Sequence, residues 1–163
     1  MDYLWTPWRF AYVSTADRAT VCVFCDKQTS KEDAREYIVH RARRNYVVLN
    51  IFPYTVGHLL IAPYRHIGKL GDASAEELGE MMELTRRAEA ALERVYLPHG
   101  INAGMNLGKS AGAGVAGHLH MHVLPRWEAD SNFVSVIGET RVLPEDLAVT
   151  WEKLRGQFGG DEG

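Results

Sequence analysis

The segment His118-Leu119-His120-Met121-His122 decides the interpretation of this sequence. Alternate residues of a β-strand point to the same face of a sheet and lie about 6.5–7 Å apart. A strand over this segment therefore places three imidazole rings side by side on one face. The leucine and methionine between them point to the opposite face, where Val123 continues the apolar pattern toward a core.

The alternating histidines admit three interpretations. Imidazole rings with pKa values near about 6.5 act as nucleophiles, proton carriers or phosphate ligands at neutral pH. The same row could be the exposed polar face of an edge strand, or the ligand set of a catalytic metal ion. Three of the seven histidines of the chain follow this alternation, and the strand carries no carboxylate base beside them. Both features favour the first interpretation.

Glycine is concentrated in the segment that precedes the histidines. Backbone N–H groups that no Cβ obstructs can converge on an anion, and Lys109 could add a further donor. A plain surface connection is the alternative, but the position directly before the histidines favours phosphate binding. The candidate phosphate contacts are Asn106, Gly108, Ser110, Gly112 and Gly114.

Farther from the histidines, strand-like and helix-like stretches follow one another. A last helix is expected from near Pro144 through Leu154. The order of strands, helix, strands and helix indicates an α+β fold with a mostly antiparallel sheet. The predicted strands are residues 46–52, 58–62, 101–107 and 118–124, the last of which stops at Pro125.

A long helix separates the second and third predicted strands. Ser74 and Glu77 have the spacing of a capping box, and Pro98 with Gly100 ends the helix. Mostly apolar residues recur at intervals of three and four and form one stripe that faces the core. This stripe comprises Leu78, Met81, Met82, Thr85, Ala88, Leu92 and Val95.

Composition is that of an ordinary globular domain. The 163 residues, 46% hydrophobic and 24% charged, can bury a core, and the net charge of −3 gives no reason to expect nucleic-acid or membrane binding. A local site can still attract a small anion. No apolar run approaches the roughly 18 residues of a membrane span, and no secretory signal is visible, so a cytoplasmic protein is expected. Residues 14–20 and 26–35 are expected to be loops, and the tail 159–163 to be disordered.

Cys22 and Cys25 are the two cysteines of the chain. A cytosolic protein has little use for a disulfide here, and one that closes so short a loop would stabilise little. The Cys-x-x-Cys pair is therefore interpreted as half of a metal site or as a redox pair. A redox pair is disfavoured, because no helix evidently opens at Cys25 to lower its pKa. A reduced pair without metal is the third interpretation.

A resemblance to a known family rests on these motifs. The segment 117–126, Gly-His-Leu-His-Met-His-Val-Leu-Pro-Arg, resembles the signature of the histidine triad (HIT) superfamily of nucleotide hydrolases and transferases. The resemblance extends from Cys22 to about Trp127 and includes Asn50, Pro53, Gly57-His58 and the Asn106 loop. Further stretches are similar to bacterial diadenosine polyphosphate hydrolases and phosphorylases. They are Leu4-Trp5-Thr6-Pro7-Trp8-Arg9, Asn106-Leu107-Gly108, Pro125-Arg126-Trp127 and Asn132-Phe133.

For the architecture, the resemblance implies a HIT-like α+β fold with a mostly antiparallel five-stranded sheet, one long helix and a C-terminal helix. It implies one domain over residues 1–163, divided into an N-terminal segment 1–45, a core 46–127 and a C-terminal extension 128–163. It also implies a symmetric homodimer with the helix and a sheet edge at the interface.

For the chemistry, the resemblance implies that His120 attacks the α-phosphate of a nucleotide and forms a covalent nucleotidyl-histidine. His118 would orient His120 through its backbone carbonyl, and His122 would bind the phosphate or the leaving-group oxygen. Loop N–H groups and Asn106 would stabilise charge on the phosphoryl oxygens. Asn50 matches a ribose-binding position. His58 matches a buried histidine behind the nucleophile, for which a structural role is expected.

The resemblance also implies one structural zinc ion per chain and no organic cofactor. Its ligands would be Cys22, Cys25, His66 and His118. A zinc ion with four protein ligands is closed to substrate, so it would connect the N-terminal loop to the catalytic strand rather than take part in the reaction.

Several functions stay open within these expectations. A hydrolase and a phosphorylase differ in the acceptor of the nucleotide, which is water or phosphate. Ala113-Gly114 stands where the phosphorylase pattern has Gly-Ser, so one hydroxyl is missing from the acceptor site, which disfavours phosphorolysis. A nucleoside phosphoramidate hydrolase is a third enzymatic function, and a module that binds nucleotide or is stabilised by zinc without catalysis is a fourth interpretation. Trp5, Trp8 and Trp127 are expected to pack in the core, unless Trp127 contacts a base or the leaving group.

Overall fold

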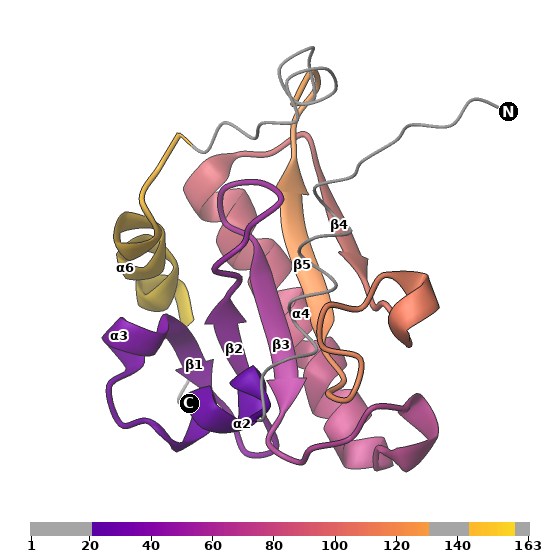
Figure 1. Cartoon of the computed structure of the whole chain (residues 1–163). Helices are drawn as coiled ribbons and strands as arrows, with labels where there is room; N and C mark the ends of the chain where they lie inside the picture. Colours follow the sequence, from indigo (N-terminus) through magenta and orange to yellow (C-terminus); the bar gives the residue numbers. More distant parts are fainter. Residues whose placement is uncertain (1–20, 131–143, 159–163) are drawn as a thin grey trace, which may run out of the picture.

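The computed structural model describes residues 21–130 and 144–158 (Figure 1). The expectations for residues 4–9 with their two tryptophans, for residues 14–20, for Asn132-Phe133 and for the tail 159–163 lie outside the described residues. Among the helices of the described ranges, none has the length and apolarity that crossing a membrane requires.

Five antiparallel strands form one sheet in the order β1-β2-β3-β5-β4. This arrangement confirms the α+β fold with an antiparallel five-stranded sheet. β1, which the sequence patterns did not predict, comes from the N-terminal part of the chain and pairs with β2. β2 and β4 each end three residues before the predicted end, because the chain turns away from the sheet there. The strands are β1 (Ile38–Arg41), β2 (Asn45–Leu49), β3 (Leu59–Pro63), β4 (Gly100–Gly104) and β5 (Met121–Arg126).

The strand of the histidine row differs from its prediction at both ends. β5 begins at Met121, so His118, at a bend, and His120 lie in the segment that leads into it. β5 also continues through Pro125 instead of stopping before it. β3 pairs with β5 only as far as Val123, so among the described strands β4 alone lies alongside the proline. A missing N–H is tolerated where one neighbouring strand has ended.

The long helix α4 (Ala75–Tyr96) begins as predicted. The Ser74 hydroxyl accepts a hydrogen bond from the Glu77 N–H, and the Glu77 carboxylate accepts one from the Ser74 N–H, which completes the capping box. The predicted stripe is wrong at Met82, whose exposed fraction is 59%. The buried stripe passes to either side of it, because the helix turns about 100° per residue. It comprises Glu77, Met81, Leu84, Thr85, Ala88, Ala91 and Leu92.

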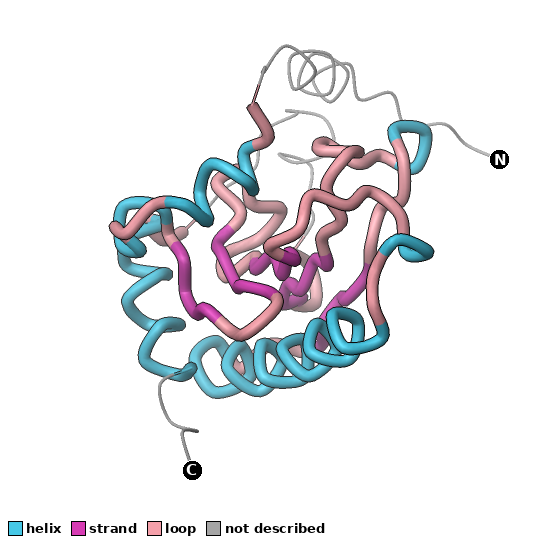
Figure 2. The backbone as a smooth tube through the Cα atoms, turned by 90° about the horizontal axis from the view of Figure 1, so that it is seen from below, coloured by secondary structure: helices cyan, strands magenta, loops and turns pink. Residues whose placement is uncertain are grey.

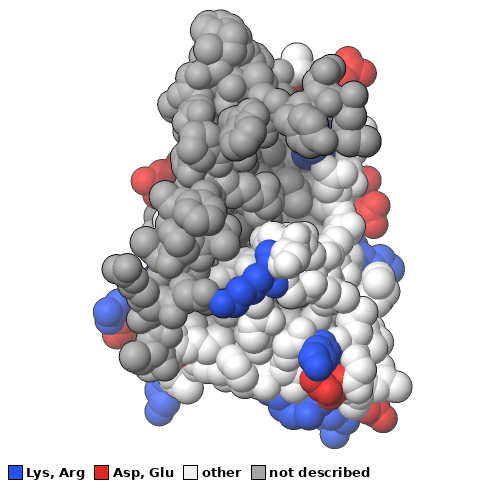
Figure 3. Space-filling model, turned by 45° about the vertical axis from the view of Figure 1, so that its right-hand side comes forward, with Lys and Arg blue, Asp and Glu red and all other residues white. Residues whose placement is uncertain are grey.

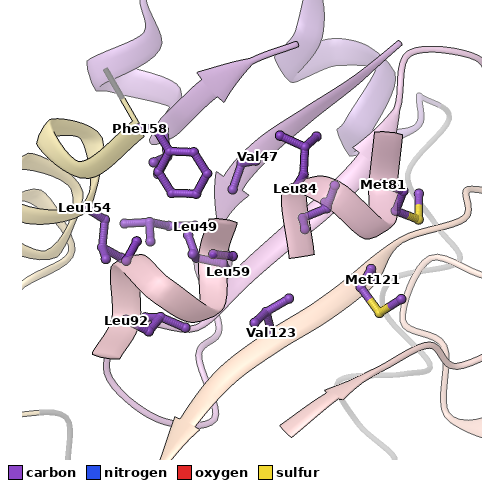
Figure 4. Close-up of a cluster of buried hydrophobic side chains, with 14 of the residues drawn as sticks. Val47, Leu49, Leu59, Met81, Leu84, Leu92, Met121, Val123, Leu154 and Phe158 are labelled. Carbon is purple, nitrogen blue, oxygen red and sulfur yellow. The ribbon is translucent and has the colours of Figure 1, made fainter. Parts of the chain in front are cut away.

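Two helices cover one face of the sheet, α4 and the C-terminal helix α6 (Leu147–Phe158). Figure 2 shows α4 beneath the strands and α6 next to it at the left, with loops gathered on the opposite side. α6 begins three residues after the predicted Pro144. The main core fills the space between this face of the sheet and the two helices (Figure 4). Its members include Val47, Leu49, Leu59, Met81, Leu84, Leu92, Met121, Val123, Leu154 and Phe158.

The opposite face of the sheet carries a smaller apolar cluster. Phe24 of helix α2 (Val23–Thr29) packs there with Tyr46, Val48 and Leu60 of the strands. The expectation of a loop over residues 26–35 is therefore wrong, since α2 and the short helix α3 (Asp33–Glu36) occupy much of it.

Ion pairs engage polar side chains of this helical segment. Lys27 pairs with Glu36, and Arg41 of β1 pairs with Asp33. Two short 3-10 turns complete the fold, η1 (Leu70–Asp72) and η2 (Lys109–Ala111).

Candidate active site and metal centre

The three histidines of the row lie on the face of the sheet opposite α4. His122 is paired with Leu60, a member of the smaller cluster, while Leu119, Met121 and Val123 belong to the main core, as the alternation predicts. The row is not an exposed polar face. His118 is 1% exposed and His120 is 6% exposed.

The proton positions on His120 follow from its hydrogen-bond partner. Its Nδ1 lies 2.7 Å from the main-chain oxygen of His118. Because a carbonyl oxygen can only accept, Nδ1 carries the proton and Nε2 keeps its lone pair. Burial lowers the pKa of His120, against a smaller opposing effect of the hydrogen bond to His118. The ring is therefore neutral at pH 7, with a nucleophilic nitrogen at Nε2.

His58 lies behind the third histidine of the row rather than behind the nucleophile. The main-chain N–H of Tyr54 donates to His58 Nδ1 over 3.1 Å, which leaves the His58 proton on Nε2. That N–H lies 2.9 Å from His122 Nδ1 and donates to it. Burial, and next the electrostatic effect of the neighbouring His120 ring, lower the pKa of His122 to about 4, so its ring is neutral at pH 7 with the proton on Nε2.

The Nε2–H of His122 is a buried donor that has no hydrogen-bond partner within the described residues. Its ring centroid is 4.9 Å from that of His120. A buried polar group without a partner costs about 1–3 kcal/mol unless a ligand or water satisfies it. A donor next to the lone pair of His120 is suited to an anionic oxygen on the group that His120 attacks.

Tyr54 and Asn50 enclose the His58–His122 pair. The Tyr54 ring stacks on His122 with a centroid distance of 5.9 Å and an interplanar angle of 11°. Asn50, the predicted ribose contact, lies directly after β2 with its Nδ2 3.3 Å from His58 Nδ1. Its Oδ1 accepts the N–H of Phe52 over 3.0 Å, which fixes the orientation of the amide.

The glycine-rich loop starts and ends beside the histidines. β4 pairs with β5 through Gly104 and His122, so Asn106 follows two residues beyond that pair. Gly108 and Gly112 flank η2 with φ values of 87° and 91°, which glycine adopts without strain. Ser110 is exposed within η2, and Gly114 lies half-buried in the turn after it. This loop thus carries all the predicted phosphate contacts except His122, and their role in phosphate binding stays a prediction.

The four predicted metal ligands meet at one point. The ligating atoms of Cys22, Cys25, His66 and His118 all lie within 4.8 Å of one another. Cys22 Sγ is 3.4 Å and Cys25 Sγ is 3.6 Å from His118 Nδ1, and Cys25 Sγ is 3.3 Å from His66 Nδ1. Tetrahedral zinc with ordinary Zn–S and Zn–N bonds separates sulfur and nitrogen by about 3.6 Å. Two thiolates and two imidazoles are also a donor set that zinc prefers.

The orientation of His118 fits the same site. Its Nε2–H donates to the carbonyl of Pro63 over 2.8 Å, so the Nδ1 lone pair faces the two sulfurs. Burial lowers the pKa of His118, which keeps the ring neutral. Burial, and then the neighbouring Cys22, raise the pKa of the Cys25 thiol. A bound cation would reverse that effect, since metal ions favour the thiolate.

Helix α2 brings a further residue to the site. Cys22 is the N-cap of α2 and Cys25 lies in its first turn. The sequence patterns did not predict this helix, so the ground for disfavouring a redox pair, the lack of an evident helix at Cys25, is wrong. Phe24 lies between them and is 4% exposed. Its ring centroid is 5.1 Å from that of His118 and 4.9 Å from that of His120. Phe24 was not among the residues predicted for the site, and its position between two candidate metal ligands was the one signal for it.

Charged side chains do not form one continuous basic surface on the described part of the face in Figure 3. Lys and Arg alternate there with Asp and Glu, and uncharged surface lies between them.

Trp127 is half-buried beyond the end of β5, where its main-chain N–H donates to Asp130 over 3.2 Å.

The family model of the HIT domain matches residues 31–129. The chain belongs to the histidine triad (HIT) family. Among HIT relatives, AP-4-A phosphorylase of Mycobacterium tuberculosis is 39% identical over 170 residues, with 97% of this chain and 85% of the relative covered. The asymmetrical bis(5'-nucleosyl)-tetraphosphatase of Schizosaccharomyces pombe is 28% identical, with 82% of this chain and 73% of the relative covered.

A solved HIT structure shares the fold. The zinc-bound histidine triad family protein from Mycobacterium smegmatis superposes with a TM-score of 0.68 at 30% identity, covering 83% of this chain and 91% of that one. The HIT-like fold and the antiparallel sheet expected from the sequence are thereby confirmed.

Proposed function

We propose that this HIT protein cleaves diadenosine polyphosphates, such as diadenosine tetraphosphate, by transferring a nucleotidyl group through His120. The observation that carries the proposal is the neutral His120 ring, whose Nδ1–H is held by the His118 carbonyl while its Nε2 lone pair is left for attack. The relatives named AP-4-A phosphorylase and bis(5'-nucleosyl)-tetraphosphatase support this class of substrate.

In the first step, His120 Nε2 attacks the α-phosphorus of the substrate. A P–N bond forms as the bond to the bridging oxygen breaks, and the remaining polyphosphate leaves as an anion. The positive charge that develops on the His120 ring is stabilised by the His118 carbonyl at Nδ1. His122 Nε2–H donates to an oxygen of the leaving group or of the phosphoryl group, and the N–H groups of the glycine-rich loop donate to the others.

In the second step, an acceptor oxygen attacks the same phosphorus and the P–N bond breaks. His120 returns to its neutral form, and the two displacements divide one difficult reaction into two easier ones. Water as acceptor gives AMP and ATP from diadenosine tetraphosphate. Inorganic phosphate gives ADP and ATP.

A product analysis identifies the acceptor. The 39% identity to AP-4-A phosphorylase favours phosphate, whereas Ala113-Gly114, without the hydroxyl of a Gly-Ser pair, favours water. Diadenosine tetraphosphate is incubated with and without phosphate, and the nucleotides are separated. ADP that appears only with phosphate establishes phosphorolysis, and AMP without phosphate establishes hydrolysis. Adenosine phosphoramidate in a parallel reaction tests for phosphoramidate hydrolysis.

The role of His120 is tested by replacement. His120→Ala should reduce turnover by roughly a thousandfold or more while AMP still binds. Rapid acid-free quenching of the natural enzyme with labelled substrate should trap label on the protein, and the variant should trap none. Retained turnover in the variant would refute the nucleophile, and AMP binding without turnover in the natural protein would favour a binding module.

We further propose that Cys22, Cys25, His66 and His118 hold one structural zinc ion, as the convergence of their ligating atoms supports. When bound, the ion would connect α2 to the loop after β3 and to the segment before β5. Metal analysis should find about one equivalent of zinc per chain, and Cys22→Ala should lose it. A chain purified without metal that neither binds added zinc nor gains thermal stability from it would contradict this site. The cytoplasmic location stays a prediction.

A further inference from the structure

His118 is shared by the metal centre and the catalytic histidines. Its Nδ1 faces both cysteine sulfurs at 3.4 and 3.6 Å, and its Nε2–H is held by the Pro63 carbonyl. Its main-chain oxygen accepts the Nδ1–H of His120 over 2.7 Å. The residue whose ring contacts the thiols therefore also orients the nucleophile.

Phe24 provides a second link between the thiols and His120. Its ring packs on His118 and His120, and its carbonyl accepts the Tyr46 hydroxyl over 2.8 Å in the buried cluster under α2. Because Phe24 lies between Cys22 and Cys25, a change in the first turn of α2 moves the ring that contacts the nucleophile.

The two thiols are accessible and close together. Cys22 and Cys25 are both half-buried rather than enclosed, and their sulfurs lie within 4.8 Å of each other. They are also the only cysteines of the chain, so thiol chemistry on this protein has one location.

We propose that the Cys22–Cys25 pair is a modification site at which a peroxide forms a disulfide. This disulfide weakens the contacts by which the His118 carbonyl and the Phe24 ring hold the His120 ring. The consequence for turnover rests on the proposed function, whereas the consequence for the His120 ring does not. The two thiolates act as the reductant, and hydrogen peroxide is the two-electron oxidant.

The Cys22–Cys25 disulfide forms in two steps. One thiolate attacks a peroxide oxygen, the O–O bond breaks, and a sulfenic acid forms with release of hydroxide. The second thiolate attacks that sulfur, the S–S bond forms, and the S–O bond breaks to release a second hydroxide. Two thiolates, one hydrogen peroxide and two protons thus give one disulfide and two water molecules. A metal ion held by the thiolates would be released.

The disulfide changes the geometry around His118. Two sulfurs in a disulfide lie about 2 Å apart, whereas two thiolates on one zinc ion lie about 3.8 Å apart. The two sulfurs must therefore move toward each other, and we expect the first turn of α2 and the Phe24 ring to shift with them relative to the His118 and His120 rings. His118 Nδ1 would also lose its contacts with the two thiols, so its main-chain carbonyl would be held less firmly against His120.

The experiment treats the full-length, zinc-loaded, reduced protein with increasing hydrogen peroxide. Free thiols and released zinc are measured with chromogenic reagents, AMP affinity by calorimetry, and the histidine rings by ¹⁵N NMR. We expect two thiols and one zinc ion to be lost together, and the His120 ring signals to change with them. AMP affinity should fall on the order of tenfold. Addition of reductant and zinc should restore both the AMP affinity and the His120 ring signals.

Two variants separate the proposed route from general oxidation. Cys22→Ser/Cys25→Ser should already show altered His120 signals and should not respond to peroxide. In Phe24→Leu the thiols should oxidise as before, but the change in the His120 signals between reduced and oxidised protein should be smaller. If the double variant does not fold, chelation of zinc from the natural protein replaces it and should alter the same signals.

Two results would overturn the inference: oxidised thiols with unchanged His120 signals and AMP affinity, or an equal loss of affinity on peroxide treatment of the double serine variant. Failure of the proposed function has a different outcome. In that case the reduced, zinc-loaded protein does not cleave diadenosine tetraphosphate, while the NMR response of His120 to thiol oxidation is still measured and decides the inference.

Discussion

At the scale of single residues, a chain of hydrogen bonds determines which nitrogen of His122 carries a proton. The Tyr54 N–H occupies His58 Nδ1, and His58 Nε2–H in turn occupies His122 Nδ1. His122 therefore presents Nε2–H toward the site. Without His58 the two tautomers of His122 would compete, and one of them would turn a lone pair toward an anionic oxygen. We therefore expect His58 to act as a positioning residue through His122.

This role predicts distinct effects for two replacements of His58. His58→Ala should lower kcat roughly tenfold to hundredfold, more for substrates with poor leaving groups, because His122 loses its fixed tautomer. His58→Gln carries an N–H that can reach His122 Nδ1 and should recover much of kcat. Steady-state kinetics over a series of leaving groups measures both effects.

A purely structural role for His58 would give another pattern. The alanine variant would then lose thermal stability and AMP affinity, with no dependence on the leaving group, and glutamine would not restore kcat. KM, kcat and the melting temperature are therefore measured for both variants.

At the scale of elements, the start of α4 is hydrogen-bonded to the loop that carries His66, a candidate metal ligand. Glu77 completes the capping box with Ser74 and also accepts hydrogen bonds from Arg65 Nε and Nη2 at 2.7 and 2.6 Å. The Glu77 side chain is 6% exposed, whereas that of Arg65 is 56% exposed. Because Arg65 directly precedes His66, the ion pair holds this part of the candidate metal centre against the helix.

Glu77 predicts a pH-dependent contribution to stability. Arg65, and next the backbone of Ser74, lower the pKa of the buried Glu77 carboxyl to about 2 against the cost of burial. The folded-state pKa is lower than the unfolded-state value, so the stabilisation is full above about pH 4.5 and is lost as the pH falls toward 2. Glu77→Gln should lower the free energy of unfolding by about 1–3 kcal/mol at pH 7.

Denaturant titrations across pH check this expectation. The difference between the natural protein and Glu77→Gln should shrink as the pH falls from about 4.5 toward 2. Glu89→Gln, on the exposed side of α4, is the matched control and should change stability little at any pH. A difference that is independent of pH would show that Glu77 acts through shape and hydrogen bonding alone.

At the scale of the whole molecule, β4 forms one edge of the sheet. Within residues 21–130 and 144–158 it pairs with β5 alone and is the last strand in the sheet order. Four of its five residues are exposed, among them Asn102 and Ala103. An exposed edge strand is a template for pairing with another chain.

The exposed edge and the family resemblance predict a homodimer in which two copies of β4 pair. Sedimentation or light scattering should give twice the mass of one chain. Ala103→Glu should shift the protein toward monomer, because like charges would face each other across the two strands. Ala148→Glu, an exposed position on α6, is the control. A monomeric natural protein, or dissociation by the control alone, would contradict the β4 interface.

Most of the fold could be predicted from patterns between near neighbours. The capping box of α4, the alternation around His120 and the order of strands and helices all depend on residues a few positions apart. β1 and α2 could not be predicted this way. β1 is short, and its register with β2 is interrupted between Ile38 and His40. α2 has one fully buried side chain, Phe24, so it lacks the periodic stripe that identifies a longer helix.

For the site, the residues proposed to carry the chemistry could be named from the sequence: the histidine row, the glycine loop and the four candidate metal ligands. How these residues act on one another depends on tertiary packing. The partnership of His58 with His122 joins residues 64 positions apart, and that of Cys22 with His118 joins residues 96 apart. Contacts over such separations depend on how the sheet, α2 and the loops pack, and residue spacing along the chain carries no measure of that packing.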